Sequence, residues 1–160
     1  MNNVLSVIFI GIAATVVMDV WGAIRKPLLG WPVAVYAMVG RWIGHMAHGV
    51  FRHERIAAAS PIKGERVLGW SVHYATGVAF AAALIGIVGF DWVQNPTLIP
   101  ALAFGIGTVA VPFLVMQPGM GAGVAASRTP NPGSARLQSL ITHTIFGVGL
   151  WAAGEAIGYL

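Results

Sequence analysis

Four strongly polar side chains lie inside long apolar segments of this sequence: Asp19, His73, His143 and Gln117. A carboxylate in an apolar helix is costly unless it points inward and finds a partner, and the two imidazoles are its natural partners. Such a set is typical of a pocket for a small solute, an ion or a proton, because imidazoles and carboxylates exchange protons and bind cations. The alternative is a hydrogen-bonded latch that only sets helix register. Hydroxyl groups of Tyr74 and Thr142 lie nearby in the sequence.

Two cofactor readings use the same residues. Asp19, His73 and His143 are acceptable ligands for a divalent metal, and His45 and His48, three residues apart, are weaker candidates. A haem held by both histidines, or a quinone, would make the protein an accessory or redox subunit. A third reading is a membrane enzyme that acts on lipid with a histidine as base. No catalytic motif occurs in the chain, so we expect binding or conduction rather than catalysis.

Composition determines which elements must position these residues. The chain has 160 residues, of which 57% are hydrophobic and only 9% charged, whereas soluble domains carry about 25% charged residues. Apolar runs of the roughly 20 residues that a bilayer requires occur at about residues 4–23, 67–89, 98–117 and 137–158. The sequence therefore predicts a single all-α membrane domain over residues 1–160, a four-helix bundle in the lipid bilayer. Cysteine is absent, which excludes disulfides and thiolate sites.

The basic residues predict the orientation. All nine lysines and arginines lie in two loops, seven between the first and second spans and two between the third and fourth. The positive-inside rule places both loops in the cytoplasm and both termini outside. Because the charges flank the spans, we expect no nucleic-acid partner. Arg41 and Arg128 are candidates for binding phospholipid headgroups.

The first cytoplasmic loop contains a further predicted helix. Pro32 suits a first helical position, and apolar residues recur at helical spacing up to His48. Residues 32–48 therefore predict an amphipathic helix at the cytoplasmic interface.

The second and fourth spans resemble each other at an offset of 70 residues. Arg66, His73 and Gly77 match Arg136, His143 and Gly147, and Asp19 matches Gln117 when VVMD is aligned with LVMQ. Each histidine follows its arginine by seven residues, which places both about 10 Å inside the basic boundary. The pattern predicts two helix hairpins in parallel orientation, as in some transporters. A four-span bundle is small for a solute pathway, so we expect a homodimer.

Four strings carry a family resemblance: VMDVW, VGRWIGH, GERVLGWSVHYATGVAFAAAL and MQPGMGAGVAASRTPNPGSARLQSLITHTIFG. Together they resemble the bacterial membrane family of unknown function DUF2938 over nearly the whole chain. The resemblance implies a small bacterial inner-membrane protein and carries over no activity and no site.

Overall fold

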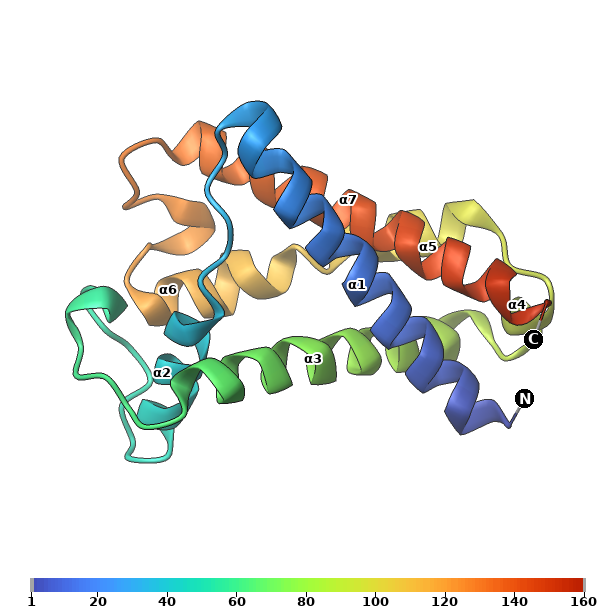
Figure 1. The fold of residues 1–160 in the computed structure, drawn as a ribbon, viewed down its shortest axis with the longest axis horizontal. Helices are drawn as coiled ribbons and strands as arrows, with labels where there is room; N and C mark the ends of the chain where they lie inside the picture. The colour runs from blue at the N-terminus through green and yellow to red at the C-terminus, as the bar shows by residue number, and fades with distance from the viewer. Residues whose placement is uncertain (1, 160) are drawn as a thin grey trace. The chain divides into compact units, whose positions relative to one another are not determined.

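The computed structural model describes residues 2–159, which form helices and loops without a β-strand (Figure 1). The longest helices are α1 (Asn3–Leu29), α3 (Glu65–Val88) and α7 (Pro132–Ile157). The shorter helices are α2 (Tyr36–Met46), α4 (Asp91–Gln94), α5 (Leu98–Gly107) and α6 (Gln117–Met120). A π-helical segment, η2 (Pro112–Met116), precedes α6, and two 3₁₀ turns form η1 (Ile56–Ala58) and η3 (Val124–Ala126). The predicted all-α class is confirmed.

Four stretches of the described chain are long and apolar enough to cross a membrane: Asn3–Leu29, Glu65–Val88, Leu98–Met120 and Pro132–Ile157. Each corresponds to one of the four predicted spans. The fold is therefore that of a helical membrane protein by the length and composition of its helices.

The first of these helices continues past the predicted end of its span at residue 23. Arg25 and Lys26 favour helix rather than end it, so α1 runs on to Gly30, whose φ of +66° suits a glycine C-cap. The Gly30 N–H donates to the Lys26 carbonyl at 3.0 Å. The first two basic residues therefore lie on the helix that carries Asp19.

The last long helix begins at Pro132, before the predicted start of the fourth span at residue 137. Asn131 Oδ1 accepts a hydrogen bond from the Ser134 N–H at 3.2 Å, as a capping side chain does. Pro132 occupies the first turn, where its missing N–H leaves no helical bond unmade. Local capping, rather than hydropathy, determines this end.

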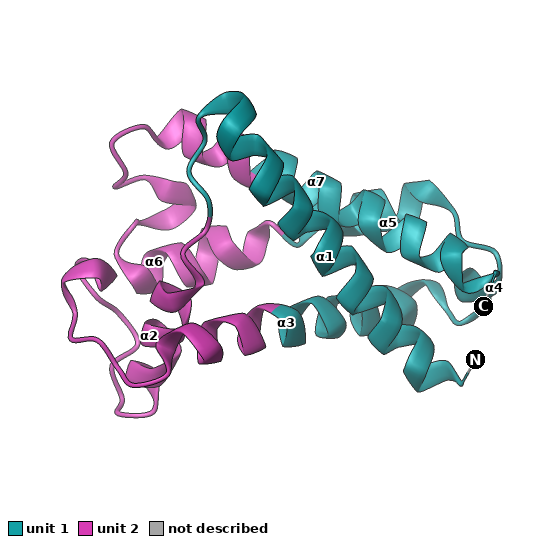
Figure 2. Ribbon diagram, viewed as in Figure 1, with its two compact units in different colours: residues 1–33, 74–108, 140–160 teal, residues 34–73, 109–139 magenta. Residues whose placement is uncertain are grey.

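The chain forms two compact units (Figure 2). Unit 1 comprises residues 1–33, 74–108 and 140–160, and unit 2 comprises residues 34–73 and 109–139. Unit 1 is a bundle of α1, the C-terminal part of α3, α5 and most of α7, and it also contains α4. Its buried core is formed by Ile10, Ala14, Ala81, Leu84, Ile85, Trp92, Val93, Ala101, Phe146, Leu150 and Ala153.

Glycines allow the helices of unit 1 to approach closely. A Cβ at Gly11 of α1 would overlap Val78 Cα and lie 2.9 Å from the Gly77 carbonyl oxygen of α3. A Cβ at Gly105 of α5 would overlap Gly147 Cα and lie 2.6 Å from Gly147 N of α7. Small residues at such crossings bring backbones together and favour helix association in membranes.

In unit 2, one side of α2 is buried inside the protein. The buried residues on this side are Gly40, Arg41 and Trp42. A Cβ at Gly40 would overlap the Glu65 carbonyl oxygen and lie 2.7 Å from Gly69 N, both on α3. The helix begins at Tyr36 instead of the predicted residue 32. Val35, the residue before it, has the non-helical backbone angles φ −100° and ψ 87°. The buried side of this helix therefore contacts protein.

Candidate functional site

Asp19 on α1 is paired with Tyr74 on α3, within unit 1. The Tyr74 hydroxyl donates to Asp19 Oδ2 at 2.9 Å, and both side chains are partly buried. An inward-facing donor is what a carboxylate inside an apolar helix requires. The sequence predicted such an inward partner, with the imidazoles as first candidates; the Tyr74 hydroxyl is a partner that the structure adds.

His143 on α7 is buried, with 9% of its surface exposed, and its Nδ1 lies 2.8 Å from Thr108 Oγ1. The Thr108 hydroxyl donates its single proton to the Gly105 carbonyl oxygen at 2.5 Å. Thr108 Oγ1 must then accept from Nδ1–H, because a hydroxyl has one proton to give. This assignment leaves the lone pair of the neutral imidazole on Nε2, which has no hydrogen-bond partner among the described residues. Thr108 therefore determines which nitrogen of His143 is open to a ligand.

Arg25 adds a buried cation to unit 1, with 8% of its surface exposed. Its Nη1 donates to Thr142 Oγ1 at 3.1 Å, and its Nη2 donates to the Pro32 carbonyl at 2.8 Å. Sequence reasoning treated Arg25 as a topology signal only. The signal it missed is that no helix-ending residue separates Arg25 from Asp19, so both belong to one helix.

The other two predicted residues, His73 and Gln117, belong to unit 2. The His73 ring stacks on Tyr36 of α2, with ring centroids 4.1 Å apart and an interplanar angle of 26°. Trp70, one turn earlier on α3, meets His73 edge-on at 5.8 Å. These contacts provide an aromatic environment for the imidazole that sequence spacing did not predict.

Gln117 directly follows the π-helical segment Pro112–Met116. Its backbone N–H donates to the Pro112 carbonyl, the i to i+5 pattern of a π-helix. Its side-chain Oε1 is buried and has no hydrogen-bond partner among the described residues. Single π-helical turns occur often at functional sites, and an unpaired buried acceptor attracts a donor or a cation.

A divalent metal was one of the predicted ligands. Within residues 2–159, no group of three or more histidine, aspartate and glutamate side chains is placed to hold a metal ion. Of the weaker metal candidates, His45 has its Nδ1 2.7 Å from His53 Nε2, whereas His48 is exposed. The chain turns after Met46, so His48 leaves the helical face.

Arg41, predicted to bind headgroups, is instead buried in unit 2. Its Nε and Nη2 donate to the two oxygens of Glu65, each at 2.8 Å, and Nη1 reaches the Ala59 carbonyl at 3.0 Å. The hydrogen bonds to Glu65 raise the pKa of Arg41 above its ordinary value. The guanidinium therefore stays charged, and its N–H groups are already bonded to Glu65. Arg128 is exposed, and its guanidinium has no partner among the described residues, which leaves it available to an anion.

The model of one protein family matches residues 8–157, and its description is "Protein of unknown function (DUF2938)". The chain belongs to the DUF2938 family. Neither a curated protein nor a solved structure matches it. The family description names no activity, so the function must be argued from the polar groups of this DUF2938 chain.

Two polar groups of this DUF2938 member are chemically open. His143 Nε2 offers a lone pair beside apolar helices, and Gln117 Oε1 offers an unpaired acceptor. An imidazole nitrogen accepts a proton or a metal, whereas an amide oxygen accepts only donors and cations. Both groups therefore favour a cationic or proton-donating ligand.

Proposed function

We propose that this DUF2938 protein binds or conducts a small solute, ion or proton through polar side chains inside its spans. The observation that supports this most is the open Nε2 of His143, since an imidazole with one unused lone pair can accept a proton or a cation. Ionisable groups inside membrane segments are rare and usually functional. Asp19, His73 and Gln117 remain the other proposed ligands.

Proton flux into proteoliposomes tests this proposal. Purified protein is reconstituted with an internal pH dye, and a potassium gradient with valinomycin drives proton entry. We expect proton flux above that of empty vesicles. We expect His143→Gln and Asp19→Asn each to reduce this flux at least about tenfold, because a positioned proton acceptor usually contributes more than a factor of ten to a proton-transfer rate. His48→Gln, which changes an exposed histidine, is the matched control. Wild-type flux equal to that of empty vesicles, or unaffected by both buried substitutions, would refute the proposal.

A second candidate is a redox or accessory subunit, because the same His143 geometry suits a haem ligand. Metal-bound histidines usually donate their other ring N–H to a neighbouring oxygen, as Nδ1 does to Thr108. The test is the visible absorbance of the purified protein, with and without added hemin. A Soret band that His143→Ala abolishes would favour this candidate, and a colourless protein that leaves hemin unchanged would remove it.

We propose a location in the bacterial inner membrane with both termini outside and both basic loops in the cytoplasm. The one-sided distribution of lysine and arginine supports this orientation. Because the chain has no cysteine, single cysteines at Lys63 and at Gln94 can be labelled in intact cells without background. An impermeant maleimide should modify the cysteine at position 94 only, and the reverse pattern would overturn the orientation.

We also propose that two parallel hairpins form the membrane domain. Gly77 and Gly147, which match at the 70-residue offset, both occupy helix crossings: Gly77 against Gly11 and Gly147 against Gly105. Equivalent contacts at matched positions are what a repeat predicts. The homodimer also stays a proposal, and native mass spectrometry from detergent would measure the mass of the assembly.

A further inference from the structure

A loop of unit 2, residues 51–60, is held by three side chains of α2. Arg41 Nη1 donates to the carbonyl oxygens of Ile56 at 3.4 Å and Ala59 at 3.0 Å. Trp42 Nε1 donates to the Phe51 carbonyl at 2.9 Å. His45 contributes the third tie, through both of its ring nitrogens. The loop is therefore fastened at its beginning, middle and end.

The bonds of His45 determine where its protons lie. Its Nε2 is 3.0 Å from the Ser60 carbonyl oxygen, which can only accept, so Nε2 carries a proton. Its Nδ1 lies 2.7 Å from His53 Nε2, and one proton must lie between those two nitrogens. In the neutral pair, His53 Nδ1 is then unprotonated, and this atom is buried without a partner.

Proton counting shows how many further protons this geometry accepts. A first added proton can go to His53 Nδ1 with both hydrogen bonds intact, although it creates a buried N–H without an acceptor. A second added proton would place two N–H groups against each other across 2.7 Å and bring two like charges together. The pair therefore cannot hold both charges and remain bonded.

The charged neighbours do not compensate two added charges. On α3, Glu65 interacts with His45 electrostatically but is already paired with Arg41 of α2. On the loop, Glu54 and Arg55 adjoin His53 and line the same cleft, one with a negative and one with a positive charge. The α6 segment that meets the loop does so through the Gly119 carbonyl, which accepts from the His53 N–H at 2.9 Å and carries no charge.

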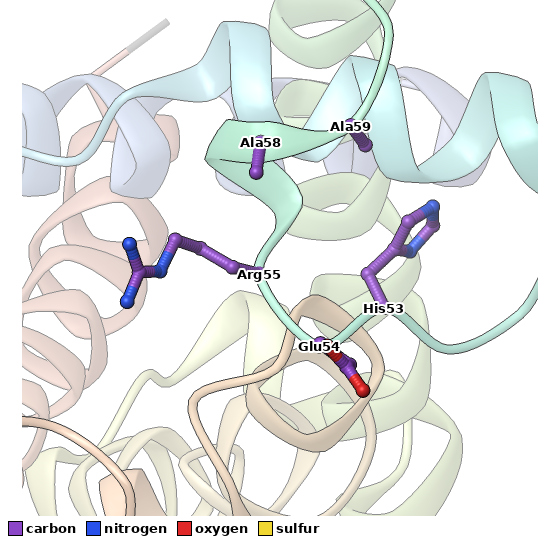
Figure 3. Close-up of a pocket in the computed structure, with 5 residues that line it drawn as sticks. All are labelled: His53, Glu54, Arg55, Ala58 and Ala59. Carbon is purple, nitrogen blue, oxygen red and sulfur yellow. The ribbon is translucent and has the colours of Figure 1, made fainter.

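We propose that the His45–His53 pair is a proton-binding latch that releases the His53 segment of loop 51–60 from α2 when both imidazoles become protonated. Among the hydrogen bonds that hold this loop, the His45–His53 bond is the one that added protons can break, since Arg41 and Trp42 keep their protons. The loop forms part of an open cleft of about 570 Å³ lined by His53, Glu54, Arg55, Ala58 and Ala59 (Figure 3). Acidification on the side of this loop would thus reshape the cleft.

Hydrogen–deuterium exchange against pH tests the latch in the full-length protein in detergent. We expect protection factors of peptides that contain His53, corrected for the intrinsic exchange rate, to fall at least about tenfold from pH 7.5 to pH 5.5, as histidine side chains take up protons. Peptides from residues 80–88 of α3 should keep their protection. His48→Gln should behave as wild type, whereas His45→Gln and His53→Gln should remove the pH dependence.

Two results would overturn the latch. One is wild-type loop protection that does not change over this pH range, a result that needs no variant and so stands even if a substitution impairs folding. The other is a fall in protection of the same size in His45→Gln and His53→Gln. Neither result bears on proton flux through His143, so the latch and the proposed function fail separately.

Discussion

Replacing Gly105 with alanine tests whether the close approach of α5 and α7 supports both the bundle and His143. The added methyl carbon would overlap Gly147 Cα and lie 2.6 Å from Gly147 N and 2.9 Å from the His143 carbonyl oxygen. All three atoms belong to the backbone of α7, so no side-chain rotation relieves the clash. The two helices must separate by roughly 1 Å to restore contacts of about 3.5 Å.

The expected cost follows from two opposing terms. Overpacking costs about 1–3 kcal/mol, and alanine in place of glycine returns up to about 1 kcal/mol of helix propensity. We therefore expect Gly105→Ala to lower the free energy of unfolding by up to about 2 kcal/mol. For a chain of this size that corresponds to a fall of up to about 8 °C in the unfolding temperature.

Thermal unfolding in detergent, followed by intrinsic tryptophan fluorescence, measures this change. Gly107→Ala is the matched control on the same helix, because a Cβ there meets no atom within 4 Å. The control should be neutral or slightly stabilising. If Gly105→Ala unfolds at the same temperature as Gly107→Ala, or higher, then α5 and α7 do not depend on this contact and the reasoning fails.

Three further predictions follow from the same structure. Gly11→Ala should lower the unfolding temperature, because the added Cβ would meet the backbone of Val78. Gly22→Ala should not lower it, because a Cβ at Gly22 meets no atom within 4 Å. Equal unfolding temperatures of the two variants would contradict this prediction. Thr108→Val should reduce proton flux and shift its pH profile, because His143 loses the acceptor that holds Nδ1–H, while Thr108→Ser should retain the wild-type profile. Arg41→Gln should lower the unfolding temperature and increase deuterium uptake in loop 51–60, since it removes both Glu65 bonds and the carbonyl contacts; unchanged loop exchange would show that Arg41 does not hold the loop.

The boundaries of the helices illustrate how far the sequence predicts the fold. Hydropathy located all four candidate spans, because crossing a bilayer depends on the number of consecutive apolar residues. Hydropathy placed the end of the first span before the end of α1, and the start of the fourth span after the start of α7. The reason is that charged residues beside an apolar span can still be helical. Capping at Gly30 and Asn131 determines these ends, and both are visible in the sequence as residue types.

The candidate site was predicted in its residue types, and two of its pairings were identified only in the structure. Asp19 and His143 were identified because polar groups inside apolar segments are rare. Their partners, Tyr74 and Thr108, lie 55 and 35 residues away and follow from helix packing. The role of Arg25 was missed for the same reason, since its contact with Thr142 spans 117 residues.

By itself, the sequence determined that this is an all-α chain with four membrane-length helices, because composition and apolar run length are local properties. It also determined which glycines and histidines were available. Only the tertiary structure decided that Gly105 supports a helix crossing while Gly107 does not. It likewise decided that His45 pairs with His53 instead of His48. These outcomes depend on which faces of distant helices meet, and neither spacing nor hydropathy along one helix contains that information.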